Sequence, residues 1–117
     1  MAIAAAQNLS ESRFRALAAE NFKRVLAAFE PVDPDVAEAE ESLGTVTIRL
    51  ADGSKWILSV QPPARQMWLA VASLGRAYHF DWNPADGTWR DSKDPQSELL
   101  SKLSALLREV AGLELRF

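Results

Sequence analysis

The apolar residues of this chain repeat with two different periods, and the points where the period changes restrict the possible folds. After Ser10, a favourable N-cap residue, they recur every three or four positions, as in an amphipathic helix, until Pro31 and Pro34. The helical positions are Phe14, Leu17, Ala18, Phe22, Val25, Leu26 and Phe29. Beyond the prolines the apolar residues alternate with others, as in strands, until helical spacing returns after Asp94. The sequence therefore predicts a helix, a run of strands and a second helix.

The alternating region predicts five or six strands joined by short turns. The expected strands are 36–41, 45–50, 55–61, 66–72, 77–82 and 88–91. Asp52-Gly53 supplies the positive φ angles of a tight hairpin turn, and a second turn is expected at 83–87. Because the turns are short, consecutive strands are expected to pair antiparallel.

The second helix is expected to begin with Asp94 as its N-cap and Pro95 at the first helical position, where the missing N–H costs nothing. Gly112 is a suitable residue after its last turn. Its predicted buried stripe consists of Leu99, Leu100, Leu103, Leu106, Leu107 and Val110. The apolar residues at 113–117 are expected to lie along the helices or to add an edge strand.

Together these elements predict an α+β fold: a two-layer sandwich with two terminal helices packed on one face of a five- to six-stranded antiparallel sheet. A chain of 117 residues is the size of one domain. We expect a flexible N-terminal tail at 1–10 and a single domain at 11–117. Since both helices cover the same face, no element remains to cover the other face of the sheet.

One tryptophan is predicted to lie on that uncovered face. Side chains alternate along a strand, so Met67 and Leu69 point to the core face and Trp68 points the other way. An exposed tryptophan is a candidate contact for a partner protein. The alternative is that Trp68 packs flat across the sheet against Ile57 or His79.

Six carboxylates are concentrated just after the first helix, with no basic residue among them. They are Glu30, Asp33, Asp35, Glu38, Glu40 and Glu41. Hard cations accept carboxylate oxygens, and a cation would relieve the repulsion between Glu38 and Glu40, which share one side of a strand. The alternative is a solvated acidic edge that keeps this strand from pairing with another chain.

Composition argues against several classes of function. The chain has no cysteine, which excludes disulfides, thiolate metal sites and a cysteine nucleophile. Its net charge of −3 argues against nucleic acid as a partner. No apolar stretch is long enough to span a membrane, and no targeting segment is recognisable, so we expect a cytoplasmic protein.

No catalytic residue is assigned. The sequence contains no recognisable Ser/His/Asp motif and no glycine-rich phosphate loop. His79 is the only histidine, and one imidazole without a neighbouring motif does not indicate catalysis or a closed metal site.

An ordered series of short motifs resembles the frataxin family, most closely its bacterial, CyaY-type members. The motifs are Ala51-Asp52-Gly53-Ser54, Gln61-x-Pro63-x-x-Gln66-x-Trp68-Leu69-Ala70, Gly75, Tyr78-His79-Phe80-Asp81-Trp82 and Trp89-x-Asp91. The resemblance extends from about Phe14 to Phe117. The order of helix, strands and helix agrees with the family fold.

The resemblance implies an iron-binding protein of iron–sulfur cluster assembly that docks on the complex of cysteine desulfurase and scaffold protein. It would regulate assembly, deliver weakly bound Fe²⁺ or Fe³⁺, or do both. Ferroxidase activity has been proposed for the family, but it needs a defined redox metal site. The last turns of the first helix in this chain have few of the carboxylates that bacterial members carry there, which does not favour that activity. We expect a monomer, and iron-dependent oligomers are an alternative to be tested. The alternative is a protein-interaction module on the same fold with no physiological metal.

The resemblance also suggests which residues of this chain take part. The six carboxylates named above would bind the metal. The partner-binding positions on the open face would be Ser59, Gln61, Gln66, Trp68 and His79. Lys23 and Arg24 stand where bacterial members are rich in carboxylates, so we expect a weaker iron site that is shifted toward the linker and first strand.

Overall fold

The computed structural model describes residues 9–117 and contains one helix, six strands and a second helix, in that order. The helices are α2 (Glu11–Phe29) and α3 (Leu99–Ala111), and the strands are β1 (Ala37–Ser42), β2 (Thr45–Leu50), β3 (Lys55–Gln61), β4 (Gln66–Val71), β5 (Arg76–Asn83) and β6 (Thr88–Asp91). Single 3₁₀ turns, η1 (Pro62–Ala64) and η2 (Ala72–Leu74), join β3 to β4 and β4 to β5. Apart from residues 9 and 10, the tail expected at 1–10 lies outside the described residues.

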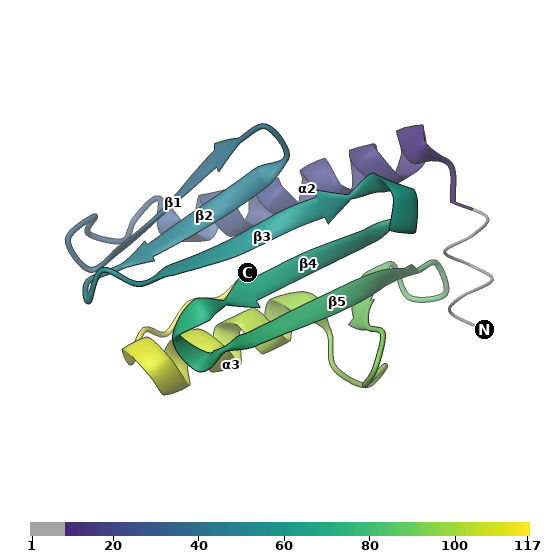
Figure 1. Ribbon diagram of the computed structural model, residues 1–117. Coiled ribbons are helices and arrows are strands. Elements are labelled where there is room, and N and C mark those ends of the chain that lie inside the picture. Colours follow the sequence, from purple (N-terminus) through teal and green to yellow (C-terminus); the bar gives the residue numbers. More distant parts are fainter. Residues whose placement is uncertain (1–8) are drawn as a thin grey trace.

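The six strands form one antiparallel sheet in which spatial order equals sequence order. Both helices lie behind this sheet and leave its front face uncovered (Figure 1). The predicted α+β two-layer sandwich is therefore confirmed, with six strands. The strand bounds differ from the predicted ones by at most one residue at each end.

The core lies between the helices and the inward-facing residues of the sheet. Trp56, Leu58 and Leu69 are fully buried there, as the alternating pattern requires. On the helix side, the rings of Phe14 and Trp89 form a T-shaped pair with centroids 5.7 Å apart. Burying this apolar surface is what fixes the register of the strands, since a slip of one residue would turn it to solvent.

The first helix begins where its capping chemistry predicts. Ser10 Oγ accepts a hydrogen bond from the backbone N–H of Arg13 at 3.1 Å. The helix ends at Phe29, before Pro31. Within its apolar stripe, Leu26 is only partly buried, whereas Asn21 is buried.

The predicted start of the second helix is wrong. Its N-cap is Glu98, whose carboxylate accepts hydrogen bonds from the backbone N–H groups of Leu100 at 2.8 Å and Ser101 at 3.2 Å. Asp94 instead begins a turn, in which the N–H of Ser97 donates to its carbonyl at 2.8 Å. Ser97 and Glu98 then return along β6, where the N–H of Asp91 donates to the carbonyl of Ser97 at 2.9 Å. This tertiary pairing outweighs the local cap signal of Asp94-Pro95.

The predicted stripe of the second helix also needs correction. Val110 is 36% exposed and Leu100 only partly buried, so the buried residues are Leu99, Leu103, Leu106 and Leu107. Gly112 follows the helix with φ +65°, a left-handed conformation that glycine adopts without a steric penalty.

The last residues lie along the helices rather than adding a strand. Ser104 Oγ donates to the carbonyl of Leu115 at 2.8 Å, and the rings of Phe29 and Phe117 are 6.3 Å apart. Within residues 9–117, no helix is long and apolar enough to cross a membrane.

Candidate functional site

The uncovered face of the sheet holds all five residues predicted to bind a partner. Strand pairing places Ser59 opposite Trp68, and Trp68 opposite His79. In the neighbouring row, Gln61 lies opposite Gln66. We call these five residues, together with Asp81 opposite Gln66, the open-face cluster.

Trp68 lies flat on this face. Its ring stacks on the imidazole of His79, with centroids 4.3 Å apart and planes inclined by 10°. Its indole Nε1–H donates to Gln66 Oε1 at 3.0 Å. The packing against His79 that the sequence left as an alternative is therefore present, and it leaves the indole partly accessible.

Asp81 is the member of the open-face cluster that the site prediction missed. Gln66 Nε2 donates to its Oδ1 at 3.0 Å, and the residue is only 7% exposed. Asp81, Gln66 and Trp68 thus form one hydrogen-bonded chain that fixes the orientation of the indole. The available signal was its spacing, since a residue two positions after His79 in a strand shares its face.

The remaining polar contact in the cluster is weaker, because Gln61 Nε2 donates to Ser59 Oγ at 3.3 Å. Strand pairing places Arg90 of β6 opposite Asp81. The side chain of Arg90, however, reaches the loop between β5 and β6. There it donates to Asp86 Oδ2 at 2.7 Å. The hydrogen bonds from Thr88 and Arg90 lower the pKa of Asp86 below its usual value.

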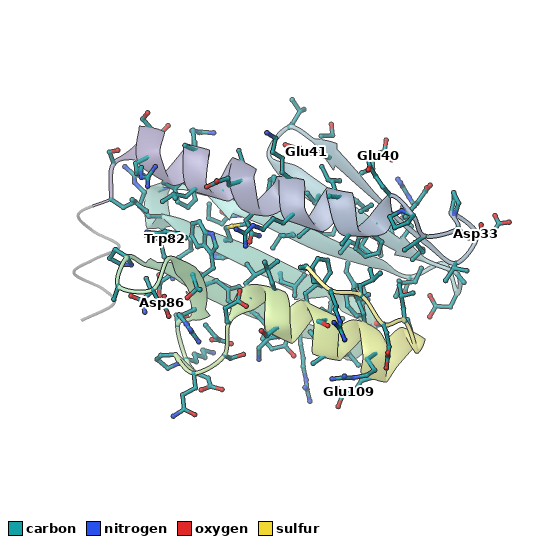
Figure 2. The ribbon with its side chains drawn as sticks, turned by 180° about the vertical axis from the view of Figure 1, so that it is seen from behind. Asp33, Glu40, Glu41, Trp82, Asp86 and Glu109 are labelled. Atoms are coloured by element: carbon teal, nitrogen blue, oxygen red, sulfur yellow. The ribbon has the colours of Figure 1, made fainter. Side chains whose placement is uncertain are left out.

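The six carboxylates, which we call the acidic edge, are distributed differently. Figure 2 shows Glu41, Glu40 and Asp33 spread along the margin of the molecule. Alternation along β1 turns Glu41 to the opposite face from Glu38 and Glu40. No three His, Asp or Glu side chains in the described part of the chain are grouped so that they could hold one metal ion.

Glu38 and Glu40 already have a cationic neighbour. Arg49 of the adjacent strand places one guanidinium nitrogen 2.9 Å from Glu40 Oε2 and 3.8 Å from Glu38 Oε1. The repulsion that a bound cation was expected to relieve is therefore partly relieved by Arg49. The donor atoms suit a hard cation, but an ion at this pair must compete with the guanidinium.

Comparison with known proteins identifies the family. The model of the frataxin-like domain matches residues 7–113. This chain belongs to the frataxin-like family. The match confirms the resemblance that the ordered motifs carry.

Bacterial relatives resemble the chain over most of its length. The iron-sulfur cluster assembly protein CyaY of Ectopseudomonas mendocina (strain ymp) is 41% identical over 112 residues, which cover 94% of this chain and 96% of the relative. The protein of the same name from Azotobacter vinelandii (strain DJ / ATCC BAA-1303) is 40% identical, with the same coverage.

A solved structure, titled "Frataxin from Psychromonas ingrahamii as a model to study stability modulation within CyaY protein family", superimposes with a TM-score of 0.80. It is 24% identical, and the match covers 91% of this chain and 95% of the other. This likeness supports the fold.

Proposed function

We propose that this frataxin-like protein acts in iron–sulfur cluster assembly, as the names of its bacterial relatives indicate for them. It docks through the open-face cluster on the complex of cysteine desulfurase and scaffold protein, in the cytoplasm. Iron is its cargo, held weakly by carboxylates of the acidic edge, and the chain works as a monomer.

The docking proposal rests on the position and fixed orientation of the Trp68 side chain. A large apolar ring lies on a face that no other element of residues 9–117 covers, and neighbouring side chains hold its orientation. Preoriented aromatic side chains bind partners efficiently because little side-chain entropy is lost on association.

A second function is supported by Arg49. Its ion pairs with Glu38 and Glu40 satisfy two of the six carboxylates without a metal. This favours a protein-interaction module with no physiological metal. The two candidate functions share the docking surface and differ only in the cargo.

Binding to immobilised cysteine desulfurase and scaffold protein of Azotobacter vinelandii tests the docking surface. We expect Trp68→Ala to weaken binding by about 30-fold or more, the range of an interface hot spot. Val110→Ala truncates a partly exposed apolar side chain on the helix side and is the matched control. Equal binding by both variants would exclude docking through Trp68.

Titration with Fe²⁺ under anaerobic conditions, followed by NMR, separates the two candidates. Iron carriage predicts saturable perturbation of amides along β1 and the 30–35 linker at micromolar metal. Perturbation confined to helix residues near Lys23 would contradict the shifted site, and no perturbation at all would leave the metal-free interaction module.

A further inference from the structure

A cleft opens at the edge of the sheet where β6 separates from β5. The two strands pair only from Phe80 to Asn83 of β5, so residues 76–79 have no strand of the described chain on that side. Figure 1 shows this first part of β5 at the margin of the sheet. The cleft measures ≈ 490 Å³ and lies between the start of β5 and residues 91–93. His79 of the open-face cluster also lines it, so the cleft continues that surface around the edge of the sheet.

The backbone of Ala77 is available for pairing at this edge. The carbonyl of His79 accepts a hydrogen bond from the N–H of Ser92 at 2.8 Å, so His79 directs its backbone polar groups away from β4. Alternate residues of an antiparallel strand direct these groups to the same side, and Ala77 therefore does the same. Its N–H and carbonyl reach an exposed edge where no strand of residues 9–117 lies opposite them. A free donor and acceptor on one edge residue are the groups with which an added strand pairs.

Cationic side chains outnumber carboxylates at this cleft. Arg76 and Lys93 line it, are exposed, and form no ion pair at 4.0 Å or less with any carboxylate of residues 9–117. The carboxylate in the lining is Asp91, which is 7% exposed and lies with its Oδ2 3.7 Å from Lys102 Nζ. Asp94 follows Lys93 in the chain but does not line the cleft. With Lys102 counted, three cationic groups stand against one lining carboxylate, and this excess favours a negatively charged ligand.

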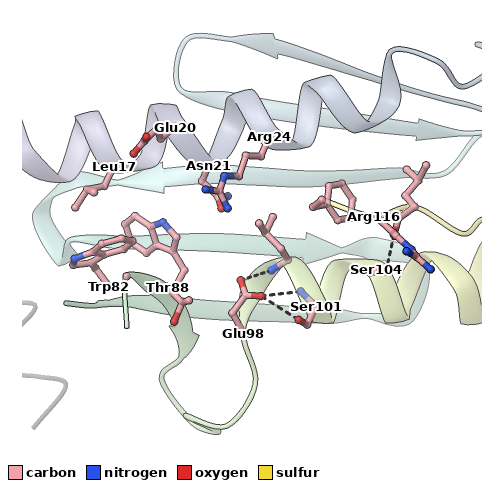
Figure 3. A pocket seen from close by; sticks show the side chains of 15 residues that line it. Leu17, Glu20, Asn21, Arg24, Trp82, Thr88, Glu98, Ser101, Ser104 and Arg116 are labelled. Carbon is pink, nitrogen blue, oxygen red and sulfur yellow. Dashed lines mark hydrogen bonds between the residues drawn. The ribbon is translucent and has the colours of Figure 1, made fainter. Parts of the chain in front are cut away.

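A groove on the helix side of the molecule differs from the cleft in its charges. It lies between α2, α3 and the last residues of the chain (Figure 3). Its charged lining residues are two arginines, Arg24 and Arg116, and two glutamates, Glu20 and Glu98. These charges balance, so the groove does not select a ligand by the sign of its charge, whereas the cleft beside β5 does.

We propose that the cleft beside β5 binds an extended acidic peptide segment by strand addition. The segment pairs with the N–H and carbonyl of Ala77, and its carboxylates bind Arg76 and Lys93. A peptide suits the cleft better than a nucleic acid does, because the free N–H and C=O groups of a strand pair with another peptide backbone. That the segment belongs to the protein docked on the open-face cluster rests on the proposed function.

NMR titration of the full chain with the peptide acetyl-Glu-Thr-Glu-Thr-Glu-amide tests the proposal. We expect saturable shifts at millimolar peptide, limited to amides of residues 75–79 and 91–93, and slower hydrogen exchange of the Ala77 amide. The analogue with glutamine in place of glutamate should bind about tenfold more weakly, because it lacks the charges. An analogue N-methylated at every residue should bind about fivefold more weakly or worse, because it cannot donate to the carbonyl of Ala77.

Substitutions in the cleft test the same contacts from the side of the protein. Arg76→Gln and Lys93→Gln should each weaken peptide binding by about two- to fivefold, the range of an exposed ion pair, and the double variant by about tenfold. Lys23→Gln removes the same charge from an exposed position on α2, outside the cleft, and is the matched control. Thermal melts check that each variant is folded.

Four results would overturn the proposal. They are equal affinity for the glutamate and glutamine peptides, equal affinity for the N-methylated analogue, unchanged peptide binding by the double variant, and no saturable shift at millimolar peptide. Trp68→Ala should bind the peptide normally, so failure here is distinguishable from failure of the docking proposal. On immobilised desulfurase and scaffold protein, the double variant should bind about fivefold more weakly, and normal docking would refute the assignment of the segment to that partner.

Discussion

The open-face cluster and the acidic edge, both expected to bind other molecules, differ in how their spacing in the sequence relates to their spacing in the structure. Residues of the open-face cluster are up to 22 positions apart in the sequence, from Ser59 to Asp81, yet strand pairing brings them into contact. The six carboxylates of the acidic edge fall within twelve residues of the sequence but are spread along the margin of the molecule. Closeness in sequence therefore says little about closeness in space at the end of a helix and along an edge strand.

The largest expected contrast is between two tryptophans on opposite faces of the sheet. Trp56→Ala empties a fully buried core site and should lower the free energy of unfolding by about 3–5 kcal/mol. Trp68→Ala loses one stacking contact and one hydrogen bond, and should cost about 1–2 kcal/mol. Urea unfolding measures both. A core-sized loss for Trp68→Ala would show that the open-face cluster is structural.

Asp81 tests whether the hydrogen-bonded chain positions Trp68. Asp81→Ala removes the acceptor of Gln66 and should weaken partner binding by about 1 kcal/mol, or roughly fivefold. Asp81→Asn keeps an oxygen acceptor and should bind nearly normally. The change in intrinsic Trp fluorescence anisotropy on Asp81→Ala provides a readout that does not depend on the partner. Identical behaviour of the two variants would contradict the positioning role.

Arg49 provides a test of whether the acidic edge binds a metal ion. Arg49→Gln removes the guanidinium that competes with a cation at Glu38 and Glu40, so Mn²⁺ or Fe²⁺ affinity should rise by about two- to fivefold. Stability should change by less than about 1 kcal/mol because the ion pairs are solvent-exposed. Calorimetric titration measures the affinity, and Arg15→Gln, which loses an exposed ion pair elsewhere, is the control. Metal affinity unchanged from the wild type would remove Glu38 and Glu40 from the iron site.

Acid titration should give the smallest effect, at the turn beside the open-face cluster. Hydrogen bonds from Thr88 and Arg90 lower the pKa of Asp86 in the folded state. A lowered pKa stabilises the fold above the unfolded-state value of 3.8, and this stabilisation is lost as pH falls through the folded-state pKa. The Tm of the wild type should therefore exceed that of Asp86→Ala near neutral pH, and the difference should shrink below about pH 4. A difference that stays constant down to pH 2 would contradict this.

Sequence patterns predicted local structure correctly wherever that structure depends on a single short segment. Ser10 caps α2, Asp52-Gly53 forms a turn, and alternation assigned Trp56 and Trp68 to opposite faces. The prediction failed at Asp94, a good N-cap residue that does not cap the helix, because pairing of Ser97 and Glu98 with β6 moves the helix start to Glu98. Glu98 is by intrinsic preference the poorer N-cap of the two, so its use could not be predicted without knowing what the intervening residues contact.

The same distinction applies to the candidate sites. The sequence alone determined the two-layer fold, the uncovered face and the tryptophan on it, since periodicity and the number of helices decide these. Only the tertiary structure decided that Asp81 anchors Gln66, that Arg49 lies against the acidic edge, and that the Nδ2 of buried Asn21 has no hydrogen-bond partner among residues 9–117. Each of these depends on strand register or helix packing, which bring together residues whose separation in sequence carries no signal.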